Sequence, residues 1–347
     1  MDKTIKIGIN GLGRIGRAAF KVLHDTPELE IAGINDLIGN ENLAYLLKYD
    51  TVYGRYPHSV DFNENALIVD DKEYPVTHIK DPASLPWGDL GVDLVFECTG
   101  VFTRRADLEK HLAAGASRVM LSAPTKSEEI ITVVHGSTEN GADEPIISCA
   151  SCTTNCITPI IEIIGRRIGL KKAMLTTIHA YTASQSIVDG PNKKMRRGRA
   201  AAENFVPTST GAAVATTKAL PQYQGRFDGV AIRAPIPVGS IADVVILTAR
   251  ETSIDEVNNI FREEANSERY RDVLGASDEP LVSSDIIQDP RASIVDLEMT
   301  QVVDGDLVKV MSWYDNEWGY VNQMVREAVD WAKIVLARKQ TQPQPTG

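Results

Sequence analysis

Apolar and polar positions alternate along the first 150 residues in two periods, one typical of strands and one typical of helices. The segment 5–9, IKIGI, is a short β-branched run, and 29–35, LEIAGIN, is another. Between them, the segment 14–25 carries apolar residues three and four positions apart, which is the helical period. Further strand candidates are LIVD at 67–70, VDLVFECTG at 92–100, SRVMLSA at 117–123, ITVVHG at 131–136 and PIISCA at 145–150, with a helix candidate at 105–116. Strands that alternate with helices predict a mostly parallel, doubly wound sheet.

The pattern changes after residue 150. Ile157, Ile160, Ile161 and Ile164 predict a helix with one apolar face, in which Pro159 must lie in the opening turns or kink the helix. The polar segment that follows has little periodicity, and loops of such length are usually functional or at an interface. That segment is 183–211, and the strand candidates around it are 173–182, 229–236, 242–249 and 293–315, the last broken by a DGD turn signal. These features predict a mixed or antiparallel sheet with helices on it.

Composition and charge narrow the class of protein. The chain has 347 residues, of which 43% are hydrophobic and 24% charged, as in a soluble globular protein. Its net charge of −11 argues against a general nucleic-acid or anionic-membrane binder. The apolar runs are too short to span a bilayer, and the N-terminus does not resemble a secretory signal. Four cysteines in so long a chain do not make a disulfide framework. We expect a cytoplasmic protein with reduced thiols.

A glycine loop follows the first strand and opens the first helix. Gly11, Gly13 and Gly16 form the pattern GxGxxG, which allows a tight turn and a close approach of the backbone to a pyrophosphate. The next strand ends in Asn35 and Asp36, about 20 residues after the last glycine, where an acid binds the adenosine ribose. Because an acid there repels a 2′-phosphate and no arginine follows it, NAD is favoured over NADP.

These observations predict an α/β protein of two domains. We expect an N-terminal Rossmann dinucleotide-binding domain over residues 1–151, completed by a C-terminal helix at 318–338. An α+β catalytic domain with a mixed or antiparallel sheet is expected over 152–317, and the polar, proline-rich segment 339–347 is expected to be a flexible tail.

The stretch ISCASCTTNC holds three of the four cysteines. Cys149, Cys152 and Cys156 lack the further ligands of a zinc site, because neither His135 nor His179 supplies a paired histidine spacing. The sequence therefore predicts no metal at these cysteines. A CxxC redox pair is a better alternative, but it lacks the βαβ context of redox proteins.

The remaining interpretation of these three cysteines is that one of them, Cys152, is a nucleophile. Cys152 precedes Thr153, Thr154 and Asn155, which are good N-cap residues, and then a helical apolar run. A thiol at a helix N-terminus is favoured as thiolate by the helix dipole. His179 lies at the end of a strand in the same half and is the candidate base. Cys156 and Cys98 are interpreted as buried small hydrophobes, and the other five histidines as satisfied or solvent-facing rings.

Several motifs together resemble one family. They are NGLGRIGR, LLKYDTVYGRY, ECTGVF, SAPTK, ASCTTNC, TTIHAYT, RRGRAAA, STGAA and WYDNEWGY, spread from residue 3 to about 333. The chain resembles phosphorylating glyceraldehyde-3-phosphate dehydrogenase, and ASCTTNC and DNEWGY are far more specific than the glycine loop. The resemblance implies NAD-dependent oxidation of glyceraldehyde 3-phosphate with inorganic phosphate as second substrate. It also implies a homotetramer.

The resemblance assigns roles to matching positions. It implies that Cys152 is the nucleophile and His179 its ion-pair partner and general base. The substrate-phosphate and inorganic-phosphate contacts that it implies are Ser151, Thr153, Thr182, Arg199, Thr210, Gly211 and Arg233. The residues expected to bind NAD come from the glycine loop and from positions that match the family. They are Gly11, Gly13, Arg14, Ile15, Gly16, Asn35, Asp36, Thr99, Ser122, Asn316 and Tyr320.

Two departures from the family pattern and three alternatives stay open at this point. Cys149 stands where the family usually has asparagine, and APIPVGSIADVV replaces the usual sequence beside Arg233. Erythrose-4-phosphate dehydrogenase shares the cysteine and the histidine, but Thr182 and the STG at 209–211 favour the triose substrate. A thiol redox sensor and an inactive binding module are hypotheses of another class.

Overall fold

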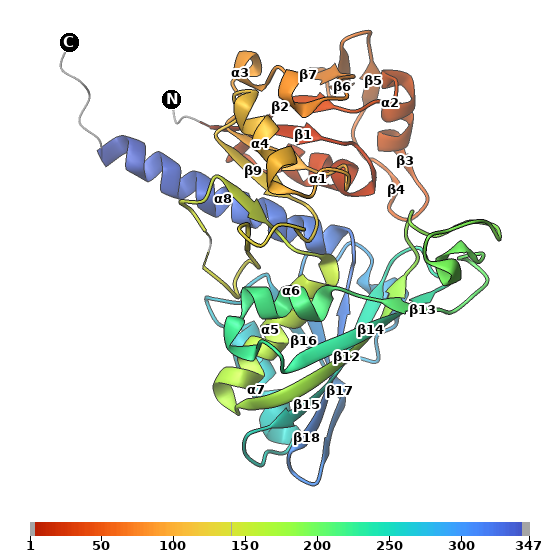
Figure 1. Ribbon diagram of the computed structural model, residues 1–347, viewed down its shortest axis with the longest axis vertical. Coiled ribbons are helices and arrows are strands. Elements are labelled where there is room, and N and C mark those ends of the chain that lie inside the picture. The colour runs from red at the N-terminus through yellow and green to blue at the C-terminus, as the bar shows by residue number, and fades with distance from the viewer. Residues whose placement is uncertain (1–3, 140, 342–347) are drawn as a thin grey trace. The chain divides into compact units, whose positions relative to one another are not determined.

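The computed structural model describes residues 4–139 and 141–341. The chain divides into two compact units, each with its own sheet (Figure 1). Within the described residues, the first unit takes 4–133, 141–149 and 324–341, and the second takes 134–139 and 150–323. The chain passes into the second unit between Cys149 and Ala150, beside the domain boundary predicted at residue 151. The exact residue of the boundary stays a prediction.

The first unit is built on a mostly parallel sheet, drawn red to gold in Figure 1. Its strand order is β10-β11-β9-β8-β1-β2-β7-β6-β5, with parallel pairing from β10 to β7 and antiparallel pairing from β7 to β5. The elements are β1 (Ile5–Asn10), α1 (Arg14–His24), β2 (Leu29–Asn35), α2 (Asn40–Lys48), β3 (Tyr49–Asp50), β4 (Gly54–Arg55), β5 (Val60–Phe62), β6 (Ala66–Val69), β7 (Lys72–Thr77), α3 (Trp87–Leu90), β8 (Leu94–Glu97), α4 (Arg105–Ala113), β9 (Arg118–Leu121), β10 (Ile131–Thr132) and β11 (Ile146–Ser148).

Strand β1 lies at the centre of this sheet and is covered on both faces. Ile5, Ile7 and Ile9 are fully buried on one face, and Gly8 and Asn10 are buried on the other. In the sheet register, Ile7 pairs with Ile31 of β2 and with Leu94 of β8. The chain therefore winds outward from β1 in both directions, and the carboxyl ends of β1 and β8 form the switch point at which such sheets bind ligands.

The second unit has a mixed sheet in the order β13-β14-β12-β15-β18-β17-β16. Strands β12 and β14 are parallel, whereas β15 pairs antiparallel with both β12 and β18. The elements are α5 (Cys152–Arg167), β12 (Leu170–Ala180), β13 (Val206–Ser209), α6 (Ala212–Ala219), β14 (Phe227–Ala234), β15 (Ser240–Thr248), α7 (Ile254–Ala265), β16 (Leu274–Ser277), β17 (Ser293–Val303), β18 (Leu307–Tyr314) and α8 (Trp318–Thr341), which continues into the first unit.

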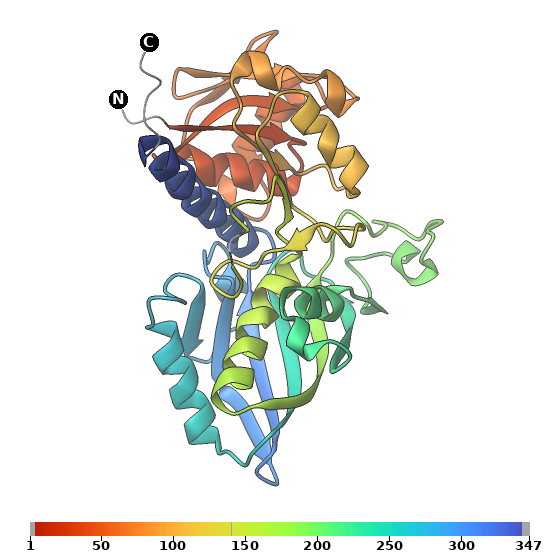
Figure 2. The same ribbon diagram turned by 60° about the vertical axis from the view of Figure 1, so that its left-hand side comes forward.

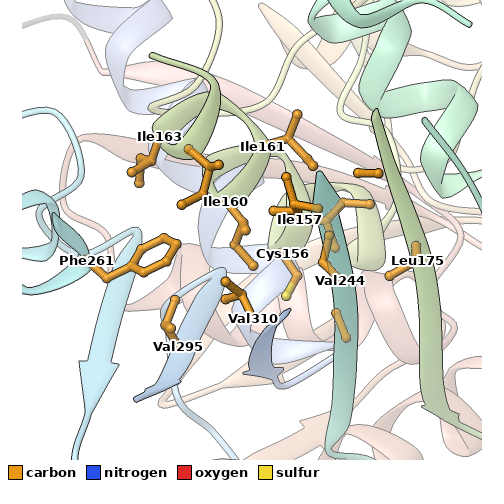
Figure 3. Packing of buried hydrophobic residues seen from close by; sticks show 14 of the residues in the cluster. Cys156, Ile157, Ile160, Ile161, Ile163, Leu175, Val244, Phe261, Val295 and Val310 are labelled. Atoms are coloured by element: carbon orange, nitrogen blue, oxygen red, sulfur yellow. The ribbon is translucent and has the colours of Figure 1, made fainter. Parts of the chain in front are cut away.

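Helices α5, α6 and α7 cover one face of the mixed sheet (Figure 2). The apolar face of α5 carries Ile157, Ile160 and Ile164, which are fully buried against strands such as β15 with Val244 (Figure 3). Pro159 is the eighth residue of α5, just after its first two turns, whereas the sequence predicted a place in the opening turns or a kink.

The fold class predicted from the sequence is confirmed, and some element bounds differ. The strand expected at 131–136 is only the two residues of β10, because the chain turns at once into a loop. The polar segment 183–211 contains β13, which pairs with β14. Helix α8 runs to Thr341, into the segment expected to be a flexible tail, and residues 342–347 lie outside the described residues. In the described part of the chain, no helix has the length and apolarity needed to cross a membrane.

Candidate active site

The thiol of Cys152 is placed by a tight junction that leads into α5. Ala150, just before it, has a φ of 58°, a left-handed conformation that is costly for a residue with a side chain. Ser151 is the N-cap, and its Oγ accepts a hydrogen bond from the backbone N–H of Thr154 at 3.2 Å. The helix therefore begins at Cys152 itself, earlier than the Thr-Thr-Asn cap that the sequence suggested.

His179 lies near the end of β12, on the sheet face that α5 covers. Its Nε2 is 3.3 Å from Cys152 Sγ, within the range of a hydrogen bond to sulfur. Its Nδ1 is 2.7 Å from the backbone oxygen of Ala180. In the tautomer with its proton on Nδ1, the ring donates to the Ala180 oxygen and the lone pair of Nε2 faces the thiol, which is the arrangement that a general base needs.

Arg233 of β14 completes this group from the neighbouring strand, where it is the register partner of His179. Its Nη1 donates to the same Ala180 oxygen at 2.9 Å and lies 2.5 Å from His179 Nδ1. One carbonyl therefore holds both side chains in place, and a fixed positive charge lies beside the imidazole and near the thiol.

Burial favours the uncharged forms of both reacting groups. It is the main cause that lowers the pKa of His179 to about 3, and the charge of Arg233 adds to the effect. Burial also raises the pKa of the Cys152 thiol, although Arg233 and hydrogen bonds at the start of α5 act in the opposite direction. The ion pair implied by the resemblance is thus opposed by burial, and a neutral imidazole beside a thiol is favoured.

Thr153 turns away from solvent. Its Oγ1 is 2.9 Å from the hydroxyl of Tyr314, which is also 2.8 Å from Oγ1 of Thr177. The Tyr314 ring lies edge-on to the His179 ring, with centroids 6.0 Å apart. The Thr153 hydroxyl, which the resemblance assigned to phosphate binding, is therefore hydrogen-bonded to Tyr314 in the interior of the unit.

A chain of hydroxyls and cations extends from the end of β12. Thr182 Oγ1 is 2.8 Å from Ser184 Oγ, and Arg197 Nη1 donates to that serine at 3.5 Å. Arg197 Nε also donates to Thr208 Oγ1 at 3.0 Å. Lys194 Nζ donates to Ser209 Oγ at 2.7 Å. We call Thr182, Ser184, Lys194, Arg197, Thr208, Ser209 and Arg233 the anion cradle, because hydroxyls and cations are the groups that bind phosphate.

Thr210 and Gly211 lead from the anion cradle into α6. Gly211 is the N-cap of this helix, and the Thr210 Oγ1 accepts from the backbone N–H of Ala212 at 3.1 Å. The structure thus places these two predicted residues next to Ser209 of the cradle, at a helix end where backbone N–H groups point outward.

Arg199 is not brought into the cradle. It pairs with Asp189 at 2.7 Å, and both side chains are more than half exposed. Arg197, two residues earlier, is the arginine whose charge contributes to the lowered pKa of His179. The sequence contained both arginines in one basic run without a period to distinguish them. The assignment of Arg199 to phosphate binding stays a prediction, and Arg197 is a second candidate from the same segment.

In the first unit, the glycine loop borders a cavity of about 400 Å³ at the switch point of the sheet. Gly11 has a φ of 92°, and a Cβ there would lie 2.9 Å from Thr99. A Cβ on Gly16 would lie 1.9 Å from the Gly11 oxygen, whereas a Cβ on Gly13 would meet open space. Gly11 and Gly16 thus shape the turn, and Gly13 leaves room for a ligand at the N-terminus of α1.

Asp36 and Asn35 have different roles at the end of β2. The carboxylate of Asp36 lines the cavity and accepts from the backbone N–H of Leu12 at 2.7 Å. Asn35 is buried and donates to Asn10 Oδ1 at 2.8 Å and to the Ile79 oxygen at 3.0 Å. Asp36 is therefore placed to meet a ribose, while Asn35 holds the strands beneath it. Lys80, which the sequence did not suggest, also lines this cavity.

Thr99 lines the same cavity and is anchored by a buried carboxylate. Glu97 accepts from the Thr99 N–H at 2.8 Å and from the Thr99 hydroxyl at 2.5 Å. Its other oxygen accepts from Asn10 and from Nε2 of His111 at 3.1 Å. Trp87 Nε1 donates to His111 Nδ1 at 3.0 Å, so the imidazole proton lies on Nε2. Sequence analysis missed this network because its members are far apart in the chain.

The other residues predicted to bind the cofactor do not line this cavity. Arg14 is held by an ion pair with Asp50 at 2.5 Å. Arg14, Ile15, Gly16 and Ser122 are not among the described residues that line the cavity. In the second unit, Asn316 Oδ1 accepts from Ser240 Oγ at 3.0 Å, which orients its amide, and the Tyr320 hydroxyl donates to the Ala150 oxygen at 3.2 Å.

All four cysteines are thiols. Burial raises the pKa of Cys98 and of Cys156 to about 12, and it raises the pKa of Cys149 further. The Cys156 side chain points from α5 into the core (Figure 3), which agrees with the interpretation of this residue as a buried small side chain. Cys98 is only partly buried and lines the cavity beside the glycine loop.

Comparison with known proteins relates both units to one family. Residues 5–105 match the family model described as glyceraldehyde 3-phosphate dehydrogenase, NAD binding domain, and residues 151–316 match that of the C-terminal domain. A glyceraldehyde-3-phosphate dehydrogenase of Streptomyces coelicolor is 47% identical over 326 residues, which is 93% of this chain and 97% of that protein. Glyceraldehyde-3-phosphate dehydrogenase 1 of Bacillus subtilis is 46% identical over 333 residues, covering 95% and 99%. The protein of that name from Mycobacterium tuberculosis strain H37Rv is 46% identical over 331 residues, covering 93% and 97%.

Proposed function

The chain belongs to the glyceraldehyde-3-phosphate dehydrogenase family of NAD-dependent oxidoreductases, and on this premise we propose that it oxidises and phosphorylates glyceraldehyde 3-phosphate to 1,3-bisphosphoglycerate. The observation that carries the proposal is the 3.3 Å contact of Cys152 with His179, at one end of an anion cradle that contains Arg233. A thiol, a base and a phosphate-binding group are the parts that this reaction needs.

The first step joins the thiol to the substrate aldehyde. Cys152 Sγ attacks the carbonyl carbon while His179 Nε2 takes the thiol proton. The proton then passes to the former carbonyl oxygen, which gives a neutral hemithioacetal on Cys152. The low pKa of His179 means that its imidazole starts this step uncharged and able to accept the proton.

Oxidation and phosphorylation follow at the same carbon. NAD, when bound, supplies the acceptor for the hydride, and Gly11, Gly13, Asp36 and Thr99 would hold it. His179 takes the hydroxyl proton as the hemithioacetal loses its hydride, which leaves a thioester. An oxygen of inorganic phosphate attacks the thioester, the C–S bond breaks, and Cys152 regains a proton from His179. The acyl phosphate departs.

The anion cradle supplies the binding sites for two phosphate groups. Arg233 and Thr182 are the groups proposed for the substrate's own phosphate. Arg197, Thr208 and the Thr210–Gly211 end of α6 are proposed for inorganic phosphate. Two anions near one carbon repel each other, and cations among hydroxyls offset that repulsion although the chain as a whole is acidic.

One assay tests the reaction. Absorbance of reduced cofactor is followed with glyceraldehyde 3-phosphate or erythrose 4-phosphate, with NAD or NADP, and with or without inorganic phosphate. We expect turnover of the triose with NAD that depends on phosphate. Faster turnover of erythrose 4-phosphate would instead indicate erythrose-4-phosphate dehydrogenase activity. The absence of any turnover would favour the hypothesis of an inactive binding module.

Variants of the two cysteines test the mechanism in the same assay. Cys152→Ser is expected to abolish oxidation because an alcohol is a far weaker nucleophile than a thiol here. Cys149→Ser should keep most of the activity and serves as the matched control. Equal losses in the two variants would support a paired-thiol mechanism instead.

We also propose that the chain forms a homotetramer through the open face of its mixed sheet. Along β15, Val244 and Ile246 point toward α5, and the alternate residues Val245 and Leu247 point to the other face. That face borders a cavity of about 470 Å³, where Met174 is 68% exposed. Apolar side chains on both faces of a sheet are typical of a strand covered on both sides.

Sedimentation velocity tests the assembly. We expect the mass of four chains for the native protein and smaller species for Val245→Lys. A monomer at all concentrations would contradict the proposal. A location in the cytoplasm, where thiols stay reduced, is part of the same proposal.

A further inference from the structure

A cluster of metal-ligating side chains lies in the first unit, apart from both sites described above. His24 is the last residue of α1, Asp25 is the C-cap of that helix, and His58 follows β4. One ligand atom from each of the three residues lies within 4.8 Å of the others. The sequence offered no role for these histidines, because they are 34 positions apart and show no ligand spacing.

Both imidazole rings are oriented by hydrogen bonds at Nδ1. His58 Nδ1 is 2.5 Å from Asp70 Oδ2, and Asp70 can only accept, so the Nδ1 proton of His58 points to that carboxylate. His24 Nδ1 is 2.8 Å from the hydroxyl of Tyr74. The Nδ1 atom of each ring is thus engaged, and His24 Nε2 lies 3.9 Å from Asp70 Oδ2. His58 Nε2 is 3.8 Å from Asp25 Oδ1.

This arrangement is the one that metal-binding histidines usually adopt. A ligating histidine nearly always donates its other ring N–H to a carboxylate or another acceptor, which fixes the tautomer and makes the ligand nitrogen more basic. Asp70 has this relation to His58.

We propose that His24, His58 and Asp25 bind a zinc-class divalent transition metal ion. Imidazole ligands with one carboxylate select zinc and its neighbours over calcium and magnesium. Tetrahedral zinc with bonds of about 2.0–2.2 Å places its ligand atoms about 3.3 Å apart, so atoms that now lie up to 4.8 Å apart must close by up to about 1.5 Å. The Asp25 side chain is 67% exposed and has the freedom to make that movement. Water completes the fourth position.

The bound ion joins the C-terminal end of α1 to the chain after β4. Helix α1 has 11 residues, so its two ends are about 16 Å apart. The glycine loop is at the other end, which separates this metal from the dinucleotide site. The role that follows is stabilisation of the first unit, with no direct part in oxidation.

Zinc titration of the full-length Cys152→Ser protein tests the proposal. This background is used because the Cys152 thiol would also bind zinc. Calorimetry should show one zinc ion per chain, and melting of the protein should shift to higher temperature. His24→Gln and His58→Gln should each weaken binding at least tenfold, and Asp70→Asn should weaken it about 10- to 100-fold. His78→Gln, which changes a histidine of the same unit outside the cluster, should bind zinc as the parent protein does.

Cobalt(II) provides a second readout in the same background. We expect the visible absorption of a tetrahedral site without thiolate charge transfer, and its loss in His58→Gln. If a glutamine variant fails to fold, as judged by circular dichroism, Asp70→Asn serves as the test. Zinc binding that is unchanged in the cluster variants, or no stoichiometric binding at all, would overturn the proposal.

Discussion

Cys152 and His179 come from the start of a helix and the end of a strand, and their Sγ and Nε2 atoms lie 3.3 Å apart. Neither residue is placed by its own element alone. The cap at Ser151 fixes the first turn of α5, and the Ala180 oxygen fixes the imidazole and Arg233 together. The geometry of the reacting pair therefore depends on a helix cap and a backbone carbonyl, neither of which takes part in the reaction.

The four thiols should differ strongly in reactivity. We expect iodoacetamide at pH 8 to modify Cys152 first, because the pKa of Cys98 and of Cys156 is raised to about 12 and that of Cys149 is raised further. A raised thiol pKa lowers the thiolate fraction at a given pH, about tenfold for each unit, so labelling should rise with pH at every cysteine. Mass spectrometry of peptides gives the rates. Labelling of Cys149 within tenfold of Cys152 would favour the redox-pair hypothesis.

The two arginines of the basic segment should behave differently. Arg197→Ala removes a charged donor to Thr208 and a cation of the anion cradle, and we expect the KM for inorganic phosphate to rise about 10- to 100-fold. Arg199→Ala breaks only an exposed ion pair with Asp189, which contributes about 0–1 kcal/mol, so its KM values should stay within about twofold. Steady-state kinetics decide between them. A larger effect at Arg199 would support the assignment made from the sequence.

Glu97 should act on cofactor binding through Thr99. In Glu97→Gln, an amide NH₂ would face the donors of Asn10 and His111, and we expect a loss of about 1–3 kcal/mol in the free energy of unfolding. The KM for NAD should rise while phosphate dependence stays the same. Urea denaturation and kinetics measure the two effects. Glu109→Gln, which changes an exposed ion pair with Arg105, is the control and should be neutral. An unchanged KM for NAD would show that the network is only structural.

Tyr314 should contribute to stability more than to chemistry. Tyr314→Phe leaves the hydroxyls of Thr153 and Thr177 without their shared partner in a buried place, which costs about 1–3 kcal/mol. We expect a lower urea midpoint and a kcat within about fivefold of the parent protein, because the ring that packs on His179 is retained. A fall in kcat of a hundredfold or more would instead place the hydroxyl among the groups that position His179.

Local signals allowed much of the fold and of both sites to be predicted. The glycine loop, Asp36 and the helix that begins beside Cys152 each depend on residues within about 25 positions of one another, where period and capping rules apply. Core strands such as β1 and β15 were visible as apolar runs.

Other features depend on contacts that no local pattern records. The hydrogen bond from Arg197 to Thr208 depends on β13, which brings that hydroxyl next to the guanidinium. His111 was interpreted as a satisfied or solvent-facing ring, and the structure shows a satisfied one, fully buried between Trp87 and Glu97 where α4 packs over the sheet; its partners were not visible in the sequence. The cap at Ser151 was missed because Thr153, Thr154 and Asn155 are equally good cap residues.

Asp36 binds the backbone of the glycine loop at Leu12 as well as facing the cavity. A substitution of Asp36 intended to admit NADP would also remove the acceptor of the Leu12 N–H and loosen the glycine turn. Cofactor preference in this protein is therefore difficult to re-engineer at a single position. A successful redesign, or a natural lineage that changed its cofactor, needs a second substitution that restores an acceptor for the Leu12 N–H.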